Sequence, residues 1–70
     1  MIITARDLIM TCRYQRGLTQ RSLAQKVGVN EYTIWAWESG RHEPLFENVI
    51  DTLDAMGFEL VLQKKTEKWK

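Results

Sequence analysis

Hydrophobic residues recur at helical spacing in four stretches of the chain, over residues 4–15, 19–27, 31–39 and 45–56. In each stretch apolar side chains return every three or four positions, which is typical of a helix with one buried face. We therefore predict four helices around one small core. The inward positions that this spacing selects are Leu8, Ile9, Cys12, Leu23, Ala24, Val27, Ile34, Trp37, Phe46, Val49, Ile50, Leu53 and Met56.

Residues that begin and end helices stand at the borders of these stretches. Thr4, Thr19 and Asn30 can each accept a hydrogen bond from a first helical turn. Gly28 suits the tight turn between the second and third helices, because glycine readily adopts the left-handed conformation that follows a helix. Two helices with so short a link cross at a steep angle, which is the helix-turn-helix arrangement. The sequence therefore predicts a helix-turn-helix over residues 19–40, whose second helix can enter the major groove of DNA.

The residues after the fourth helix have the pattern of a β-strand. Phe58–Gln63 is a short, mainly apolar run that follows a glycine. A single strand has unpaired backbone groups on both edges and needs a partner. Met1–Ile3 is one candidate, but we favour the same strand of a second subunit, paired antiparallel about a two-fold axis. Residues 58–70 would then comprise this strand and a short tail, and the strand residues predicted to form a homodimer are Phe58, Leu60, Val61 and Leu62.

The length and the cysteine count fit a single small domain in a reducing compartment. The chain has 70 residues, which we take as one domain over residues 1–70. Its one cysteine, Cys12, excludes an internal disulfide, and we therefore expect a cytoplasmic location. No apolar run approaches the roughly 20 residues that cross a bilayer, so no membrane partner is expected.

The sequence offers no set of residues suited to catalysis or metal binding. Cys12 and His42 are each alone of their kind, so we expect no metal cluster and no other cofactor. There is no nucleophile paired with a base, no pair of catalytic carboxylates and no glycine-rich phosphate loop in the sequence. We therefore predict a protein that is not an enzyme and that has no small-molecule substrate.

The net charge of +1 hides a separation of charge along the chain. Residues 13–41 contain five cationic and two acidic side chains, whereas residues 42–59 contain five acidic side chains and no lysine or arginine. Four lysines follow between Lys64 and the C-terminus. The cationic region coincides with the predicted helix-turn-helix, which favours a polyanion such as double-stranded DNA as the partner.

Three motifs and their spacing resemble a known family of DNA-binding proteins. They are R-x-x-x-G-L-T-Q-x-x-L-A from Arg13 to Ala24, V-G-V from Val27 to Val29, and I-x-x-W-E-x-G-R-x-x-P from Ile34 to Pro44. Over about residues 9–57 the chain resembles the phage-repressor, Cro-like (Xre-type) helix-turn-helix regulators. The resemblance implies an all-α, lambda-repressor-like domain of four to five helices that binds DNA. The strand after the last helix is similar to the ending of the antitoxin subgroup, whose members dimerise through C-terminal strands.

The resemblance places the DNA contacts on the helix-turn-helix and on the loop that follows it. The positions that match base readers, or lie beside them in the groove, are Glu31, Tyr32, Trp35 and Ala36. The positions predicted to contact phosphates are Gln20, at the start of a helix, and Thr33, Ser39, Arg41, Arg16 and Arg21. Gln20, Arg16 and Arg21 also fit ordinary solvent-exposed positions.

The first two base-reading positions carry Glu31 and Tyr32, whereas many relatives have Gln at both. Glu31 can accept a hydrogen bond from cytosine N4, or it can be an acid at the positive end of the helix dipole. Tyr32 can meet a base, a thymine methyl group or a phosphate, whereas Ala36 offers only apolar contact. Trp35 points away from the inward-facing Trp37, and it can pack on sugars and thymine methyl groups or cover an arginine stem.

Arg13 and Glu38 match a pair that, in this family, links the first helix to the third by an ion pair, and we assign both to structure. A partly buried pair contributes little net stability, but removal of one partner leaves an uncompensated charge. His42 is expected to be a loop residue rather than a pH sensor.

Three functions fit these features. The first is a sequence-specific regulator of transcription that acts as a homodimeric repressor on a palindromic operator. The second is an antitoxin that also binds a toxin protein through the acidic fourth helix or the tail. The third is a protein-interaction adaptor that uses this fold without DNA. Charge reversal at Arg16 and Arg41 separates the third from the first, because it should abolish DNA binding and leave a protein partnership intact.

Overall fold

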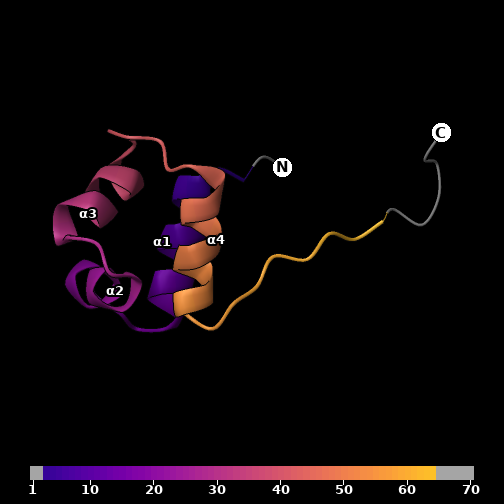
Figure 1. The fold of residues 1–70 in the computed structure, drawn as a ribbon, viewed down its shortest axis with the longest axis horizontal. Coiled ribbons are helices and arrows are strands. Elements are labelled where there is room, and N and C mark those ends of the chain that lie inside the picture. The colour runs from indigo at the N-terminus through magenta and orange to yellow at the C-terminus, as the bar shows by residue number, and fades with distance from the viewer. Residues whose placement is uncertain (1–2, 65–70) are drawn as a thin grey trace.

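The computed structural model describes residues 3–64, which form four helices and an extended C-terminal segment (Figure 1). The helices are α1 (Ala5–Gln15), α2 (Gln20–Val27), α3 (Glu31–Ser39) and α4 (Phe46–Ala55). Each begins and ends within one residue of a stretch predicted from the hydrophobic spacing, so the all-α fold class is confirmed. Within residues 3–64, no helix has both the length and the apolar character to cross a membrane.

Side-chain caps fix where the first three helices begin. Thr4 Oγ1 accepts a hydrogen bond from the N–H three residues later at 3.1 Å, and Asn30 Oδ1 does the same at 3.0 Å. Thr19 and Ser22 form a reciprocal box, in which the N–H of each residue donates to the side-chain oxygen of the other, at 2.9 and 3.0 Å. The caps predicted at Thr4, Thr19 and Asn30 are therefore confirmed.

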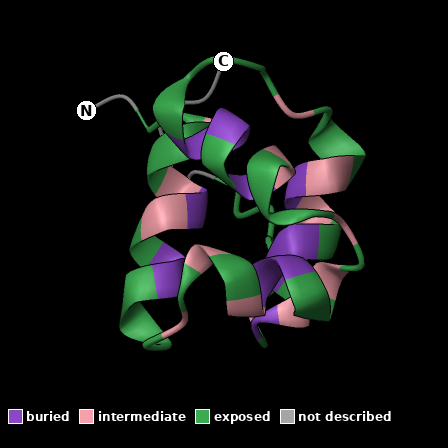
Figure 2. Cartoon of the chain, turned by 90° about the vertical axis from the view of Figure 1, so that its left-hand side faces the viewer, coloured by how far each residue is buried: buried purple, intermediate pink, exposed green. Residues whose placement is uncertain are grey.

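One hydrophobic core lies between the four helices. Both α1 and α2 pack against α3 and α4, and the buried positions of Figure 2 lie mainly on the sides of the helices that face inward. The buried core residues are Ile9, Cys12, Leu23, Ala24, Ile34, Trp37, Val49, Leu53 and Met56, with Leu8, Leu18, Val27 and Phe58 packed at the edge. The helical spacing predicted most of this set, because it depends only on which residues share a helix face.

Three positions of α4 differ from the prediction. Ile50, predicted to face inward, is only half-buried and is not among the core residues. Phe46, predicted to face the core, has 74% of its surface exposed. A helical side chain leans toward the N-terminus of its helix, and Phe46 is the first residue of α4, so its ring extends past the start of the helix. Thr52 is fully buried although its side chain is polar. Its hydroxyl donates to the carbonyl of Asn48 at 2.7 Å, which satisfies the group inside the core.

The C-terminal segment after α4 is extended but forms no strand within residues 3–64. It runs away from the helices in Figure 1, and Leu60, Val61 and Leu62 are exposed. Phe58 instead belongs to the fold of the single chain, because its N–H donates to the carbonyl of Leu53 at 2.9 Å and its ring packs at the edge of the core. The strand predicted over Phe58–Gln63 is therefore not formed within residues 3–64, since a strand requires a neighbouring backbone.

Part of this prediction falls outside the described residues. Met1 and Ile2, two of the three residues proposed as a pairing partner, lie outside them, and so do residues 65–70 of the tail, including Trp69. Ile3 is described and is exposed. Pairing with a second copy of the chain stays a prediction.

Candidate nucleic-acid interface

A three-residue turn, residues 28–30, sets the direction of α3 relative to α2. The N–H groups of Gly28 and Val29 both donate to the carbonyl of Ala24, at 2.9 and 3.0 Å. Gly28 has φ of 91°, a left-handed conformation in which any larger residue is strained. Asn30 then caps α3. The turn is thus closed by hydrogen bonds on both sides, which fixes the crossing of the two helices.

One side of α3 is exposed to solvent. Glu31, Tyr32 and Trp35 are exposed, and all three fall on one side of a helix with 3.6 residues per turn. Ser39 continues this side at the C-terminal end, and Thr33 lies half-buried beside it. Three of the four residues predicted to read bases therefore share one exposed surface, on the second helix of the helix-turn-helix.

Ala36 is a correction to the predicted set of base readers. It is only 1% exposed, so it has no surface to present to a base. The loop after α3 turns back over this position, where the N–H of His42 donates to the carbonyl of Ala36 at 3.2 Å. The resemblance to the family placed Ala36 among the base readers, and it did not specify the path of the loop that follows α3 in this chain.

Two aromatic rings lie together on the exposed side of α3. The ring centroids of Tyr32 and Trp35 are 5.4 Å apart, with the ring planes tilted by 38°. The ring of His42 meets that of Tyr32 edge-on at 6.5 Å. The sequence contained a signal for the first contact, because residues three apart on a helix are neighbours. The position of His42 depends on the fold of the loop and was missed.

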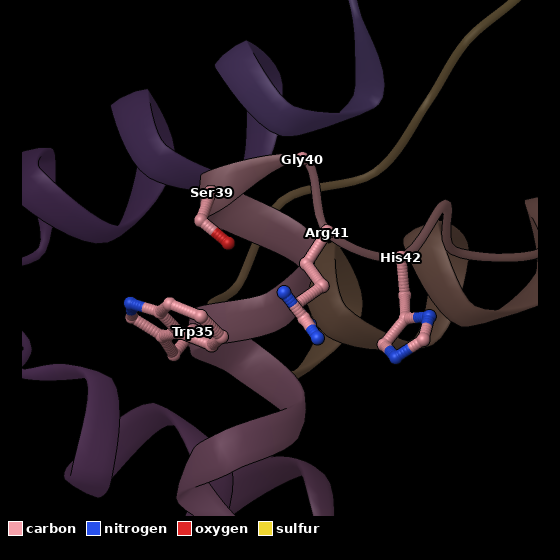
Figure 3. A pocket seen from close by; sticks show the side chains of 5 residues that line it. All are labelled: Trp35, Ser39, Gly40, Arg41 and His42. Atoms are coloured by element: carbon pink, nitrogen blue, oxygen red, sulfur yellow. The ribbon is translucent and has the colours of Figure 1, made fainter.

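An open hollow lies at the C-terminal end of α3, where Trp35 of the aromatic pair forms part of its wall (Figure 3). It has a volume of about 550 Å³ and is lined by Trp35, Ser39, Gly40, Arg41 and His42. Arg41 supplies a cation to this surface and is exposed. The hydroxyl of Ser39 donates to the carbonyl of Ala36 at 3.3 Å. The hollow therefore combines an apolar wall, formed by the indole, with a cationic rim.

A buried ion pair holds α3 against α1. Arg13 Nε and Nη2 donate to the two carboxylate oxygens of Glu38, at 2.6 and 2.8 Å, and both residues are buried. Arg13 Nη1 also donates to the carbonyl of Leu18 at 2.9 Å. The hydrogen bonds with Glu38 raise the pKa of Arg13 above its ordinary value. This pair occupies the positions that the motifs assigned to structure, and it fixes how far α3 projects from the core.

Gln20 joins the same network, which the sequence did not indicate. Its side-chain amide donates to Glu38 Oε1 at 3.0 Å, so Gln20 links the start of α2 to the end of α3. The side-chain amide is partly used in this bond. The backbone N–H groups of Gln20 and Arg21 are the better phosphate donors, because the N–H of Ser22 already donates to Thr19 Oγ1 and that of Leu23 to the carbonyl of Thr19. Thr33 is similarly engaged, since its hydroxyl donates to Asn30 Oδ1 at 2.9 Å.

Arg16 and Arg21 lie in different surroundings. Arg16 Nε donates to the carbonyl of Met56 at 2.6 Å, and its guanidinium lies over the ring of Phe58 at 5.5 Å. Arg16 therefore fastens the C-terminal end of α4 through its Nε, and because the residue is exposed, its contact with a phosphate stays a prediction. Arg21 lies in the first turn of α2 and is exposed, as a phosphate contact requires.

The titratable residues form no metal site within residues 3–64, where no group of three or more His, Cys, Asp or Glu side chains gathers. Cys12 is buried in the core, and burial raises the pKa of its thiol. It lies among apolar side chains and has no place in the surface described above.

A family model described as helix-turn-helix matches residues 9–62. The chain belongs to the helix-turn-helix family. The match spans α2, the turn and α3, together with α4 and most of α1, so the predicted helix-turn-helix family is confirmed, whereas the bounds 19–40 of the motif itself stay a prediction.

The chain is also similar to an uncharacterized HTH-type transcriptional regulator of Methanothermobacter thermautotrophicus. The two sequences are 51% identical over 39 residues, which is 56% of this chain and 56% of the relative. The match thus spans little more than half of the relative's length. No solved structure matches the chain significantly.

Proposed function

We propose that this helix-turn-helix protein is a DNA-binding regulator of transcription that reads the major groove with the exposed side of α3. One observation carries the proposal: the exposed side of α3 is held on a rigid base. Arg13, Glu38 and Gln20 tie α3 to α1 and α2 from within, while Glu31, Tyr32 and Trp35 point to solvent. Rigid presentation of a helix face is what readout of base edges requires. Membership of the family and the printed name of the relative support the same function.

The chemistry of the reading residues defines what they would recognise. Glu31, in the first turn of α3, can accept a hydrogen bond from cytosine N4 but would repel a phosphate. Tyr32 offers a hydroxyl group and a ring edge, and Trp35 offers a large apolar surface. A carboxylate beside two aromatic rings is an unusual reading surface, so the operator should differ from one read by amide side chains.

Phosphate contacts would frame this surface on two sides. Arg41, at the hollow beyond α3, and Arg21, in the first turn of α2, are exposed cations near the two ends of the motif. The first-turn N–H groups of α2, starting at Gln20, add donors at the positive end of a helix dipole. Thr33 and Ser39 carry hydroxyl groups on α3 that could add further donors. Each phosphate neutralised by a cation should add a slope of about −0.9 to the dependence of log affinity on log salt.

We further propose that the protein acts as a homodimer on a palindromic operator and represses by covering a promoter. Two copies of α3 would then lie about 34 Å apart, which is one helical turn of DNA. The exposed Leu60, Val61 and Leu62 lie in an extended segment, where antiparallel pairing with a second copy would cover them. As the single cysteine indicates, we place this function in the cytoplasm.

Selection of bound sequences from random duplexes tests the proposal. The full chain should enrich one sequence motif, and measured binding to it should weaken steeply with salt. Arg41→Gln should reduce the slope of log affinity against log salt by about 1. Lys26→Gln is the matched control, because Lys26 lies beside the C-terminal end of α4 and should leave the slope unchanged. Failure to enrich any duplex, at low ionic strength as well, would refute DNA binding.

A second function, neutralisation of a toxin protein, is favoured by a surface on α4. Glu47, Asp51 and Asp54 are exposed there, and Leu45 and Phe46 expose apolar surface at the start of the same helix. Figure 1 shows α4 on the far side of the helical body from α3, so a protein bound there would leave the DNA surface free.

Charge reversal by Arg41→Glu separates an adaptor from a regulator, because it should abolish DNA binding and leave binding of a protein partner unchanged.

A further inference from the structure

The aromatic pair Tyr32–Trp35 exposes apolar surface where a soluble domain has no structural use for it. Tyr32 is 54% exposed and Trp35 is 42% exposed, and neither belongs to the core, where Trp37 fills the space under α3. Contiguous exposed apolar surface of this kind marks an interaction site. Because the two rings lie 5.4 Å apart and tilted, each restricts the motion of the other, and they form one surface rather than two separate side chains.

The surroundings of the pair restrict what it can bind. On one side lies the cationic rim of the hollow with Arg41 and the ring of His42, and on the other lies the carboxylate of Glu31 at the start of the helix. Arg41 can meet a phosphate at the edge of a DNA groove, whereas Glu31, which would repel a phosphate, can lie only over a base edge that donates a hydrogen bond, such as cytosine N4. The apolar surface in the middle would therefore face the floor of the groove.

The floor of the major groove contains one kind of apolar group, the methyl group at C5 of a pyrimidine. Thymine carries it, and cytosine carries it when methylated. We propose that the Tyr32–Trp35 pair is a specificity determinant that binds pyrimidine 5-methyl groups. This inference rests on the proposed DNA-binding function and adds the chemical group that the exposed side of α3 selects.

Replacement of thymine by uracil in the selected duplex tests the inference directly, because it removes the methyl group and keeps every hydrogen-bonding group of the base. Each contacted thymine replaced should weaken binding of the wild-type chain about fourfold, the value for loss of one buried methyl group. Replacement of each cytosine of the selected duplex by 5-methylcytosine separates the two sources of the methyl group. If cytosine methylation raises the affinity and uracil substitution leaves it unchanged, methylated cytosine is the ligand. If uracil substitution lowers the affinity, thymine is the ligand.

Protein variants connect the effect to the aromatic pair. Trp35→Ala should bind thymine and uracil duplexes equally. Tyr32→Phe, which keeps the ring, should retain the wild-type difference in affinity between the two duplexes. Phe46→Ala is the matched control, since Phe46 is an exposed aromatic residue at the start of α4 and should keep the wild-type difference. Thermal unfolding of each variant checks the fold. If Trp35→Ala is unfolded, Tyr32→Ala takes its place, because it should also lose the difference in affinity between thymine and uracil duplexes.

The outcomes are distinct from failure of DNA binding itself. If a selected duplex binds tightly but no uracil or 5-methylcytosine substitution changes its affinity, the inference is overturned and the proposed function stands. The same holds if both Trp35→Ala and Tyr32→Ala keep the full wild-type difference. If no duplex is selected, both are overturned. Loss of a protein partner in Trp35→Ala, with DNA affinity unchanged, would assign the pair to a protein interface instead and overturn the inference.

Discussion

Removal of Glu38 should destabilise the fold strongly. Its carboxylate accepts hydrogen bonds from Arg13 Nε at 2.6 Å, from Arg13 Nη2 at 2.8 Å and from Gln20 Nε2 at 3.0 Å. In Glu38→Ala, the charge of Arg13 stays buried and, among the described residues, keeps the carbonyl of Leu18 as its acceptor. Loss of one partner of such a pair costs about 3–5 kcal/mol.

This loss is large relative to the total free energy of unfolding of the protein. At roughly 0.05–0.15 kcal/mol per residue, a chain of 70 residues has a free energy of unfolding of about 4–10 kcal/mol. Glu38→Ala should therefore lose a third or more of it. Urea unfolding at 25 °C, followed by far-ultraviolet circular dichroism, measures the difference through the midpoint of the transition.

The double variant Arg13→Met/Glu38→Leu distinguishes the free-energy cost of leaving Arg13 unpaired from the net contribution of the intact ion pair to stability. It removes both charges and fills the space with apolar groups, so it should recover stability to within about 1 kcal/mol of wild type. Glu47→Ala, which removes an exposed acid of α4, is the control and should change stability by less than about 0.5 kcal/mol. The reasoning is refuted if Glu38→Ala costs less than about 1 kcal/mol, or if the double variant is no more stable than the single one.

Three further predictions follow from the buried thiol, the turn and the terminal segment. Cys12, buried and with a raised pKa, should react with a thiol reagent at pH 8 at least about tenfold more slowly in the native chain than in urea; equal rates would contradict its burial. Gly28→Ala should cost about 1–2 kcal/mol of the free energy of unfolding through its φ of 91° alone, because an added Cβ meets no atom within 4 Å, and an unchanged urea midpoint would be inconsistent with this turn. Val61→Pro should convert a dimer to a monomer in sedimentation equilibrium, since proline cannot donate to a strand ladder, and dimers that survive would place the interface elsewhere.

Much of the fold was predictable because short-range rules determine it. Thr19, Asn30 and Gly28 act within three or four residues of their own positions, and the sequence displays all three. The core residues follow from helical periodicity, which depends only on which positions share a face. The prediction that Phe46 is buried was wrong because this residue stands at the start of α4, where periodicity does not tell whether a neighbouring helix extends far enough to cover the ring.

The features of the site that the sequence did not indicate arise where distant segments meet. Ala36 lies on the expected side of α3 but is covered by a loop whose path no local pattern specifies. Arg16 bonds to a carbonyl 40 residues away, and Gln20 to a carboxylate 18 residues away, so the reach of both side chains depends on the packed structure. The strand expected at Phe58–Gln63 has the right composition, but a strand exists only with a partner, and residues 3–64 supply none.

A chemical-shift map of the labelled full chain on a selected duplex tests the central claim most directly, because it reports which backbone amides change their surroundings when DNA binds. The largest changes should fall on the first turn of α2, on Glu31, Tyr32 and Trp35 of α3, and on Arg41, while the exposed side of α4 stays unchanged. Changes confined to α4 or to residues 58–64, with the exposed side of α3 unaffected, would show that α3 is not the surface that reads DNA.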